Sequence, residues 1–343
     1  MIRTLPPAPG PTVPPAPTWP LALLAALVCL AALWSLAIGP GGVSLDGLAR
    51  AMMADGAGHD RLILREVRLP RMLTGLVAGG ALATAGAILQ AITANPMAAP
   101  GLLGINAGAA LAVVAGMSLF GLASGGALVW LAFAGGSLAA VLVLAASTLG
   151  GAREQPVLLV LAGAVLTAFL MSLTAALLIF DRTTLGNLRL WTAGSLVGRD
   201  MAQVTQVLPH VLAGLAAALA LSRQLVLLGL GPEAARSLGQ NPLLWRAIAV
   251  AIVTLLSGGA VALAGPVGFV GLVVPNVMRL WLGPDLRRLL PFCALGGAAL
   301  VLLADCAGRM LFPDQSFPVG VTMALIGTPF FIALARGRAG GGR

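Results

Sequence analysis

The sequence has no lysine, no tyrosine and few charged residues of either sign. Charged residues make up 9% of the 343 positions, whereas soluble globular domains carry about 25%. A soluble fold is therefore excluded for most of the chain. The absence of lysine also excludes a Walker A phosphate loop, because that loop needs a lysine on the nucleotide phosphates. The chain holds no ATP site of this type.

Cysteine and histidine are scarce and scattered, and acids are nearly absent from the apolar runs. Zinc sites space their cysteine and histidine ligands closely in the sequence, and no such spacing occurs here. No Ser/His/Asp or Cys/His grouping indicates an enzyme. We therefore expect no catalytic residue, no metal and no cofactor in this chain, and packing or loop roles for Cys29, Cys293, Cys306, His59 and His210.

Hydrophobic residues make up 59% of the chain. They form recurrent runs long enough to cross a hydrocarbon core about 30 Å thick as helices. The runs are continuous rather than alternating with a period of two, which argues against a β-barrel. The sequence predicts an all-α integral membrane protein with ten transmembrane helices, at residues 20–38, 70–93, 101–121, 126–149, 157–180, 203–222, 245–264, 267–282, 289–305 and 318–335. The run 267–282 contains glycines and prolines and is expected to be kinked or broken.

Three regions follow from this pattern. Residues 1–19 are rich in proline and are predicted to be a disordered tail. The next run is interpreted as an uncleaved first span, because no cleavage site with a soluble domain follows it. Residues 20–336 form the membrane domain, and residues 337–343 a second tail. Ten spans place both termini on one side, and the arginines slightly favour the cytoplasm for that side.

The helices are rich in small residues, with 45 glycines in all. Small residues let membrane helices approach closely, because van der Waals packing drives their association. The stretches "AGGALATAGA" (78–87) and "GLLGINAGAALAVVAG" (101–116) are therefore predicted at tight helix contacts. "GGALATAG" (79–86) resembles "GGAVALAG" (258–265), in spans that would run in opposite directions. This match is either an inverted repeat, as in many transporters, or chance in a Gly/Ala-rich chain.

The polar residues in the middle of the spans are neutral, for example Thr84, Gln90 and Thr167. Ionisable groups at membrane depth are costly and usually functional, as in proton relays. Their lack argues against a stand-alone secondary transporter, so the energy for any transport must come from a partner. A membrane sensor or scaffold that transports nothing is a further alternative.

The longest internal polar stretch is "RQLVLLGLGPEAARSLGQNPLLWR", residues 223–246. The sequence "GPE" at 231–233 predicts a helix start, with proline and an acid in the first turn. Ala234, Ala235 and Leu238 are expected along one side of this helix. A short helix held between two turns at the membrane face suits docking to a soluble partner, and an ordinary loop with one helical turn is the alternative.

Several long stretches resemble the FecCD family, the permease subunits of ABC importers for ferric siderophores, haem and vitamin B12. "RLPRMLTGLVAGGALATAGAILQAITANPMAAPGLLGINAGAA" is similar to the second and third helices of that family. "LLGLGPEAARSLGQNPLLWR" is similar to its cytoplasmic coupling segment. "VALAGPVGFVGLVVPNVMRL", "LLPFCALGGAALVLLADCAGRM" and "FPVGVTMALIGTPFF" are similar to its last three helices. The resemblance covers residues 20–336 in order.

The resemblance implies a type II ABC importer in the cytoplasmic (inner) membrane, with both termini cytoplasmic. Two permease subunits of ten helices each would surround a central pathway, and the second subunit is either another copy of this chain or a homologue. Two ATPase subunits, which bind ATP and magnesium, would lie below, and a substrate-binding protein would dock above. Lipid surrounds the subunit, and no nucleic acid is expected as a partner.

The resemblance also implies three docking cations. In the family, an R-x-x-R pair before the second helix and an arginine after the ninth helix face outward and pair with acids of the binding protein. Here these are Arg68, Arg71 and Arg309. Guanidinium groups can hold carboxylates bidentately and orient an approaching partner. The alternative is that these arginines snorkel or pair within the chain, with Glu66 and Asp305.

A turn into the third helix is implied at Asn95, Pro96 and Pro100, with Ala99 in place of an acid usual in the family. Proline ends the preceding helix because it lacks a backbone donor, and the asparagine can cap exposed backbone groups.

The coupling segment covers about residues 227–244. Its helix would sit in a cleft of the ATPase and transmit nucleotide-driven closure to the spans. The residues carried over are Glu233, Ala235, Arg236, Leu238 and Gly239. The fifth helix lines the pathway in this family, and its start would lie near an inner gate at Pro156 and Val157.

The substrate is implied by two further stretches. "LLGINAGAALAVV" and "LWTAGSLVGRDM" look most like ferric-siderophore members. The resemblance therefore implies that the chain moves a ferric siderophore from a periplasmic or extracellular binding protein to the cytoplasm. Haem or cobalamin import by the same architecture is the alternative.

Overall fold

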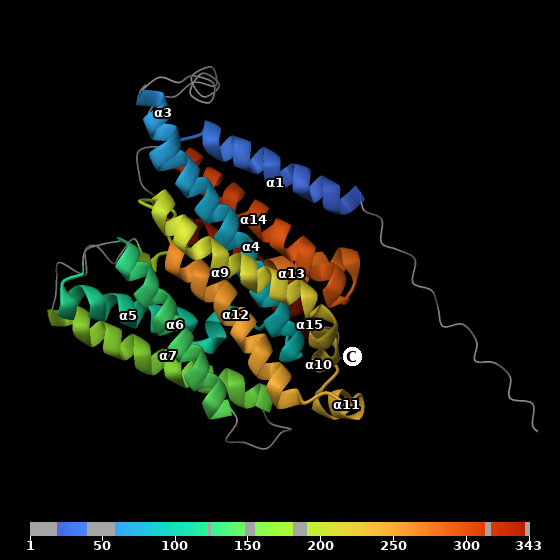
Figure 1. The fold of residues 1–343 in the computed structure, drawn as a ribbon. Coiled ribbons are helices and arrows are strands. Elements are labelled where there is room, and N and C mark those ends of the chain that lie inside the picture. Colours follow the sequence, from blue (N-terminus) through green and yellow to red (C-terminus); the bar gives the residue numbers. More distant parts are fainter. Residues whose placement is uncertain are drawn as a thin grey trace, which may run out of the picture.

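The computed structural model describes residues 19–39, 59–122, 125–147, 155–180, 191–312 and 317–339. These residues form helices and connecting turns, with no strand among them (Figure 1). The predicted tails lie almost wholly outside the described residues. The helices are α1 (Trp19–Ala37), α3 (His59–Ile63), a π-helix (Leu64–Arg68), α4 (Leu69–Ile92), a 3-10 helix (Pro100–Leu103), α5 (Ile105–Phe120), α6 (Gly125–Ser147), α7 (Gln155–Phe180), α9 (Met201–Ala220), α10 (Ser222–Gly229), α11 (Pro232–Ser237), α12 (Pro242–Ala264), α13 (Val270–Leu282), α14 (Leu286–Leu311) and α15 (Val319–Ala339).

All ten predicted spans are occupied by apolar helices. Within the described part of the chain, seven helices are long and apolar enough to cross a membrane, and α5, α13 and most of α15 are shorter apolar helices. The prediction of an all-α membrane protein is confirmed. The expected break in the eighth run is also present, because α13 begins only at Val270, after Phe269 in the left-handed conformation.

Two predicted spans are longer in the structure than in the sequence analysis. The second continues upstream as one apolar helix from Asp60 to Ile92, with the π-helix inside it. The ninth extends to Leu311. Arg309 therefore lies within α14, one helical turn after Asp305, and the expectation that it follows the ninth helix is wrong.

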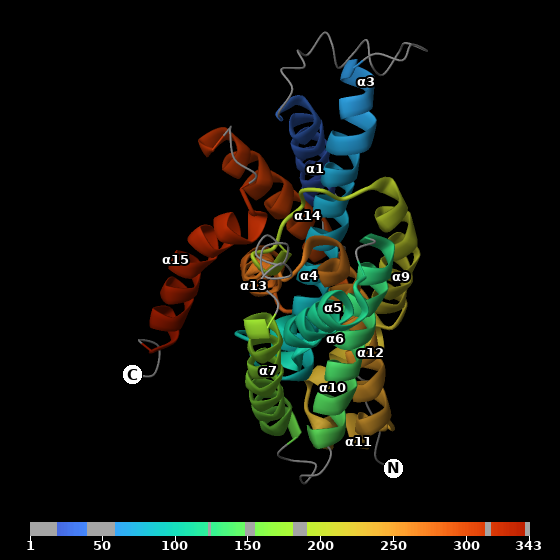
Figure 2. The same cartoon turned by 90° about the vertical axis from the view of Figure 1, so that its left-hand side faces the viewer.

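Helix α4 lies at the centre of the bundle, among α1, α9, α12, α13 and α14 (Figure 2). Its central position depends on glycine. A Cβ on Gly79 would lie 2.3 Å from the carbonyl oxygen of Gly297 in α14, and one on Gly86 would lie 1.9 Å from that of Gly271 in α13. Only hydrogen fits at such crossings, because a Cβ would overlap the facing backbone. The predicted tight contact of residues 78–87 is confirmed.

Helices α5 and α6 cross in the same manner. A Cβ on Gly108 would lie 2.4 Å from the carbonyl oxygen of Gly135, and one on Gly135 would lie 2.3 Å from that of Gly108. The second predicted tight contact, residues 101–116, is therefore also confirmed. Gly104, with a φ of 70°, separates the 3-10 helix from α5.

The bundle has two distinct ends (Figure 2). The end of α1, the start of α4 and the end of α14 meet at one end, which we call the arginine end. Helices α10 and α11 lie at the opposite end, which we call the α11 end. The matching stretches 79–86 and 258–265 lie on α4 and α12. These two helices pack together and run in opposite directions, as an inverted repeat would require.

Candidate functional site

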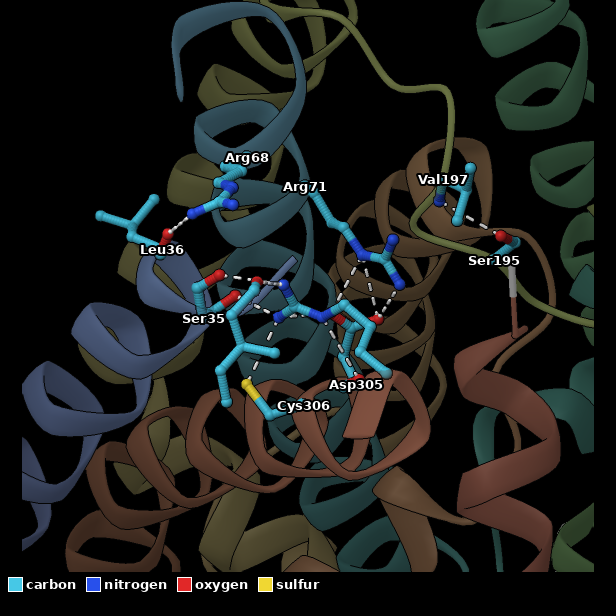
Figure 3. Close-up of polar contacts among 10 residues, drawn as sticks. Ser35, Leu36, Arg68, Arg71, Ser195, Val197, Asp305 and Cys306 are labelled. Carbon is cyan, nitrogen blue, oxygen red and sulfur yellow. Dashed lines mark hydrogen bonds and ion pairs between the residues drawn. The ribbon is translucent and has the colours of Figure 1, made fainter. Parts of the chain in front are cut away.

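The arginine end is built around one buried carboxylate. Arg71, in the first turn of α4, donates from Nη2 to Asp305 Oδ1 at 2.7 Å and from Nε to Oδ2 at 3.0 Å (Figure 3). The Asp305 side chain is 1% exposed and that of Arg71 is 11% exposed. The two parallel hydrogen bonds match the planar guanidinium fork to the carboxylate. This ion pair joins the start of α4 to α14.

Arg309 binds the same carboxylate and reaches α1. Its Nη2 lies 3.0 Å from Asp305 Oδ2 and donates to the Ser35 hydroxyl at 2.9 Å and to the Cys306 sulfur at 3.3 Å. Its Nη1 donates to the Ser35 carbonyl at 3.0 Å and to the Ile38 carbonyl. The residue is 7% exposed. Arg309 therefore connects α14 to the last turn of α1.

Arg68 caps the same end of α1 from the other side. Its Nη1 donates to the carbonyls of Leu36 at 2.7 Å and Ala37 at 3.1 Å, and its Nη2 donates to that of Gly39 at 3.2 Å. The residue is 3% exposed. The last carbonyls of a helix have no intrahelical partner and carry partial negative charge. Two arginines therefore satisfy the end of α1 and are stabilised by its dipole.

The geometry divides the three predicted docking residues into two kinds. Arg68 and Arg309 are buried and make several hydrogen bonds within the chain. Arg71 is the most exposed of the three, and its Nη1 makes no hydrogen bond with the described part of the chain. Asp305 serves as the internal acid, whereas Glu66 is exposed. Asp305 pairs with Arg71 and Arg309. The charge of Asp60 also acts on Arg68.

Sequence reasoning missed how α1 enters this cluster. Ser35 and the carbonyls at the end of α1 contribute six acceptors, and no local motif marks them. Backbone carbonyls carry no residue identity, so only the packing of α1 against α14 reveals the contact.

The turn after α4 is held by side-chain and backbone hydrogen bonds. Asn95 Oδ1 accepts from the amide of Met97 at 2.9 Å. The carbonyl of Pro96 accepts from Asn276 Nδ2 of α13 at 2.9 Å. Pro100 occupies the first turn of the 3-10 helix, where its missing N–H costs nothing. Asn276, which the sequence analysis did not single out, thus ties the turn to α13.

A second polar link joins α4 and α13 close to this turn. Gln90 Nε2 donates to the carbonyl of Gly271 at 3.1 Å, and Arg279 Nη1 donates to Gln90 Oε1. Gln90 is therefore satisfied by protein groups inside the bundle, as a buried amide must be. It acts as a bridge between helices rather than as an open polar group in a pathway.

Helix α11 forms the candidate coupling site. Gly231 and Gly239 bound it with φ values of 101° and 80°, in the region that favours glycine. Glu233 and Arg236 are exposed, and Leu238 is 59% exposed, although it is an apolar side chain.

One expectation for this helix is wrong. Ala235 is 0% exposed and Leu238 is largely exposed, so the two do not share one side with Ala234. Ala235 is buried where α11 packs onto the bundle. Gln240 Nε2 also donates to the carbonyl of Gln224 in α10 at 3.1 Å, which fixes the end of α11. The exposed surface includes Glu233, Arg236 and Leu238.

Helix α7 presents a broad apolar face. Pro156 lies in its first turn, and Val157 is 71% exposed. Leu161, Val165 and Phe169 follow Val157 at four-residue spacing and are each more than half exposed. An exposed apolar stripe of this length is typical of contact with lipid or another subunit.

Within the described residues, no group of three or more His, Cys, Asp or Glu side chains is placed to hold a metal ion. Cys293 and Cys306 are buried, and Cys29 is exposed.

Comparisons with known proteins find similarity along nearly the whole chain. A family model described as the FecCD transport family matches residues 26–337. The chain is 39% identical over 316 residues to the probable siderophore transport system permease protein YfiZ of Bacillus subtilis (strain 168), covering 90% of this chain and 95% of that protein. It is 40% identical over 316 residues to the ferric enterobactin transport system permease protein FepD of Escherichia coli (strain K12), covering 92% and 94%.

A solved structure supports the same similarity in three dimensions. It is an inward-facing conformation of an ABC transporter assigned to the metal-chelate type. The TM-score is 0.80 at 28% identity, over 93% of this chain and 99% of that chain.

Proposed function

Because this chain belongs to the FecCD transport family, we propose that it is the membrane-spanning permease subunit of an ATP-driven importer for a ferric siderophore. It is not an enzyme by itself. The sequence lacks the lysine of a Walker A loop, so ATP and magnesium would be bound by partner ATPase subunits. The substrate would pass from a binding protein on the outside to the cytoplasm.

The observation that carries the substrate class is the full-length similarity to permeases named for siderophore and ferric enterobactin transport. The match extends over both ends of the bundle, so it includes the surfaces on which both kinds of partner would act. Haem or cobalamin import would use the same architecture and is an outcome of the test below.

The α11 end would face the cytoplasm and the ATPase. Its exposed surface combines one acid, one base and one leucine: Glu233, Arg236 and Leu238. The buried Ala235 and the hydrogen bond from Gln240 to the carbonyl of Gln224 attach this surface to the bundle. Rigid attachment is what transmission of ATPase closure to the helices requires. In this orientation both tails are cytoplasmic.

The arginine end would face the binding protein, with Arg71 as the contact residue. Arg71 offers a guanidinium nitrogen that makes no hydrogen bond with the described residues, and its charge would steer and hold an acid of the partner. Arg68 and Arg309 would position this end by holding α1 and α14 together. If Arg71 contacts the binding protein, changing Asp305 should affect the affinity for that protein differently than if Arg71 only pairs within the chain.

Two variants separate these roles. Asp305→Asn removes the internal anion but keeps the Arg71 charge, whereas Arg71→Gln removes that charge. If Arg71 docks, Arg71→Gln weakens binding-protein affinity about tenfold or more. Asp305→Asn also destabilises the fold, so its affinity is measured on protein that remains folded, where we expect it to be unchanged or tighter. Equal losses in both variants would show that Arg71 acts only within the chain. Binding is measured by surface plasmon resonance on the assembled transporter.

The dimer would form through the exposed face of α7, with Val157 and Pro156 near the inner gate. Its apolar stripe is long enough for a subunit contact and lies apart from the arginine cluster. Mass spectrometry of the subunits in the purified complex will show whether the second subunit is a copy of this chain or a homologue.

Uptake of radioactive iron by cells with and without this chain tests the function. The cells are starved of iron, and unlabelled ferric siderophores, haem and cobalamin are added in turn as competitors. We expect deletion to abolish uptake, and one siderophore class to compete. Unchanged iron uptake would contradict the siderophore assignment, and loss of haem or cobalamin uptake instead would identify the substrate as that alternative.

A further inference from the structure

Helix α1 lies along α14 (Figure 1). A long apolar groove lies between these two helices. Its volume is about 1130 Å³, and α13 forms its third wall. This exceeds the ~300–1,000 Å³ typical of small-molecule pockets. Among the residues that line it, Arg288 is the one charged side chain. The groove is separate from the arginine cluster and from α11.

The groove spans about one leaflet of a bilayer. Helices α1 and α14 run in the same direction, because Val28 packs against Ala298 and Ser35 contacts Arg309. Trp19, which begins α1, therefore lies at the same end of the groove as Arg288, which is in the first turn of α14. On α1 the lining extends from Trp19 to Leu30. At 1.5 Å per residue this is about 17 Å, roughly half of a 30 Å hydrocarbon core.

Two tryptophans mark where the headgroup level lies. Trp19 and Trp281 both line the groove and are 67% and 74% exposed. Tryptophan side chains concentrate at the boundary between hydrocarbon and headgroups. Arg288 lies at this same end, and an arginine there extends its guanidinium toward the headgroups. The groove thus has an apolar length of one leaflet and a cation at the depth of the phosphates.

We propose that this groove binds one anionic phospholipid, with its acyl chains against α1, α13 and α14 and its phosphate on Arg288. Arg288 lies 3.9 Å from Asp285, and both side chains are partly exposed. A phosphate oxygen can accept shorter, charge-assisted hydrogen bonds from the guanidinium. If the α11 end is cytoplasmic, as proposed above, the lipid belongs to the inner leaflet, where anionic lipids attract basic groups.

Native mass spectrometry of the full chain in detergent tests the site. Phosphatidylglycerol is titrated in one series and phosphatidylcholine, which has no net charge, in the other. Ala26→Trp fills the groove from an exposed position on α1, and Arg288→Gln removes the cation. The matched controls are Ala22→Trp, which is exposed on α1 outside the groove, and Arg287→Gln, the exposed neighbour of Arg288.

We expect the unchanged chain to retain one phosphatidylglycerol at concentrations that leave phosphatidylcholine unbound. Both groove variants should lower this retention about tenfold, and both controls should keep it. Equal retention of the two lipids by all five proteins would mean general lipid contact only and would overturn the proposal. Loss of a dimer mass in Ala26→Trp without a change in bound lipid would assign the groove to a second copy. The number of bound lipids per chain is measured without transport. The test of the lipid site is therefore independent of the test of the proposed function.

Discussion

Arg71 and Asp305 lie 234 positions apart in the sequence and form a bidentate ion pair, with a shortest nitrogen–oxygen distance of 2.7 Å (Figure 3). Asp305 also pairs with Arg309 at 3.0 Å, and Arg309 binds the end of α1. One buried carboxylate therefore holds together the ends of three helices. A partner that binds Arg71 is therefore linked to the ends of α1, α4 and α14.

Replacing Asp305 with asparagine should destabilise the protein strongly. The change leaves Arg71 and Arg309 without their anion, and removing one partner of a buried ion pair costs about 3–5 kcal/mol. Thermal unfolding in detergent measures the effect. Glu66→Gln is the matched control, because Glu66 is an exposed acid at the same end, and it should change stability by less than about 0.5 kcal/mol. Equal effects of the two changes would contradict the central role of Asp305.

Arg68→Ala should loosen the end of α1 while leaving the rest of the bundle folded. The change removes hydrogen bonds to three carbonyls, and the loss of charged hydrogen bonds of this kind costs about 2 kcal/mol. Hydrogen–deuterium exchange should become faster in the last turn of α1 and stay unchanged in α12. Arg65→Ala, at an exposed position in the same π-helix, should leave exchange as it is. Protection that persists in the Arg68 variant would refute the capping role.

Gly79→Ala should destabilise the crossing of α4 and α14. The new Cβ would lie 2.3 Å from the carbonyl oxygen of Gly297, so the helices must separate. Overpacking of this kind costs about 1–3 kcal/mol, seen as a lower midpoint of thermal unfolding. Gly268→Ala is the control, because a Cβ there meets no atom within 4 Å. A Gly79 variant as stable as the control would mean that α4 and α14 repack without cost.

Leu238→Asp should weaken binding of the ATPase and thereby reduce transport. Leu238 is 59% exposed at the α11 end, and a buried aspartate in an apolar ATPase contact would lower affinity at least about tenfold. ATPase co-purification and iron uptake should both fall. Leu119→Asp, with 64% exposure in the last turn of α5, should retain ATPase binding. Ala235→Arg is a poorer probe, because Ala235 is fully buried and the change would disrupt α11 itself.

The sequence alone was sufficient for the architecture. Hydrophobic runs depend only on local composition, so all ten helices could be located, and the helix bounds differ mostly by a few residues. The turn at Asn95–Pro96 was equally readable, because proline and asparagine act on their own backbone. The "GPE" start of α11 is local in the same sense.

The tertiary structure decided which way side chains face. Ala235 and Leu238 are near neighbours in one short segment, but one is buried and the other exposed, because only the packing of α11 on the bundle distinguishes its faces. Three arginines were predicted to face outward as docking cations. In the structure, Arg68 is buried against the end of α1, and Arg309 is buried against Asp305 and α1. Charge is a property of the residue and can be read from the sequence. Burial and pairing depend on contacts between different helices, some of them more than 200 residues apart, and these form only when the helices pack.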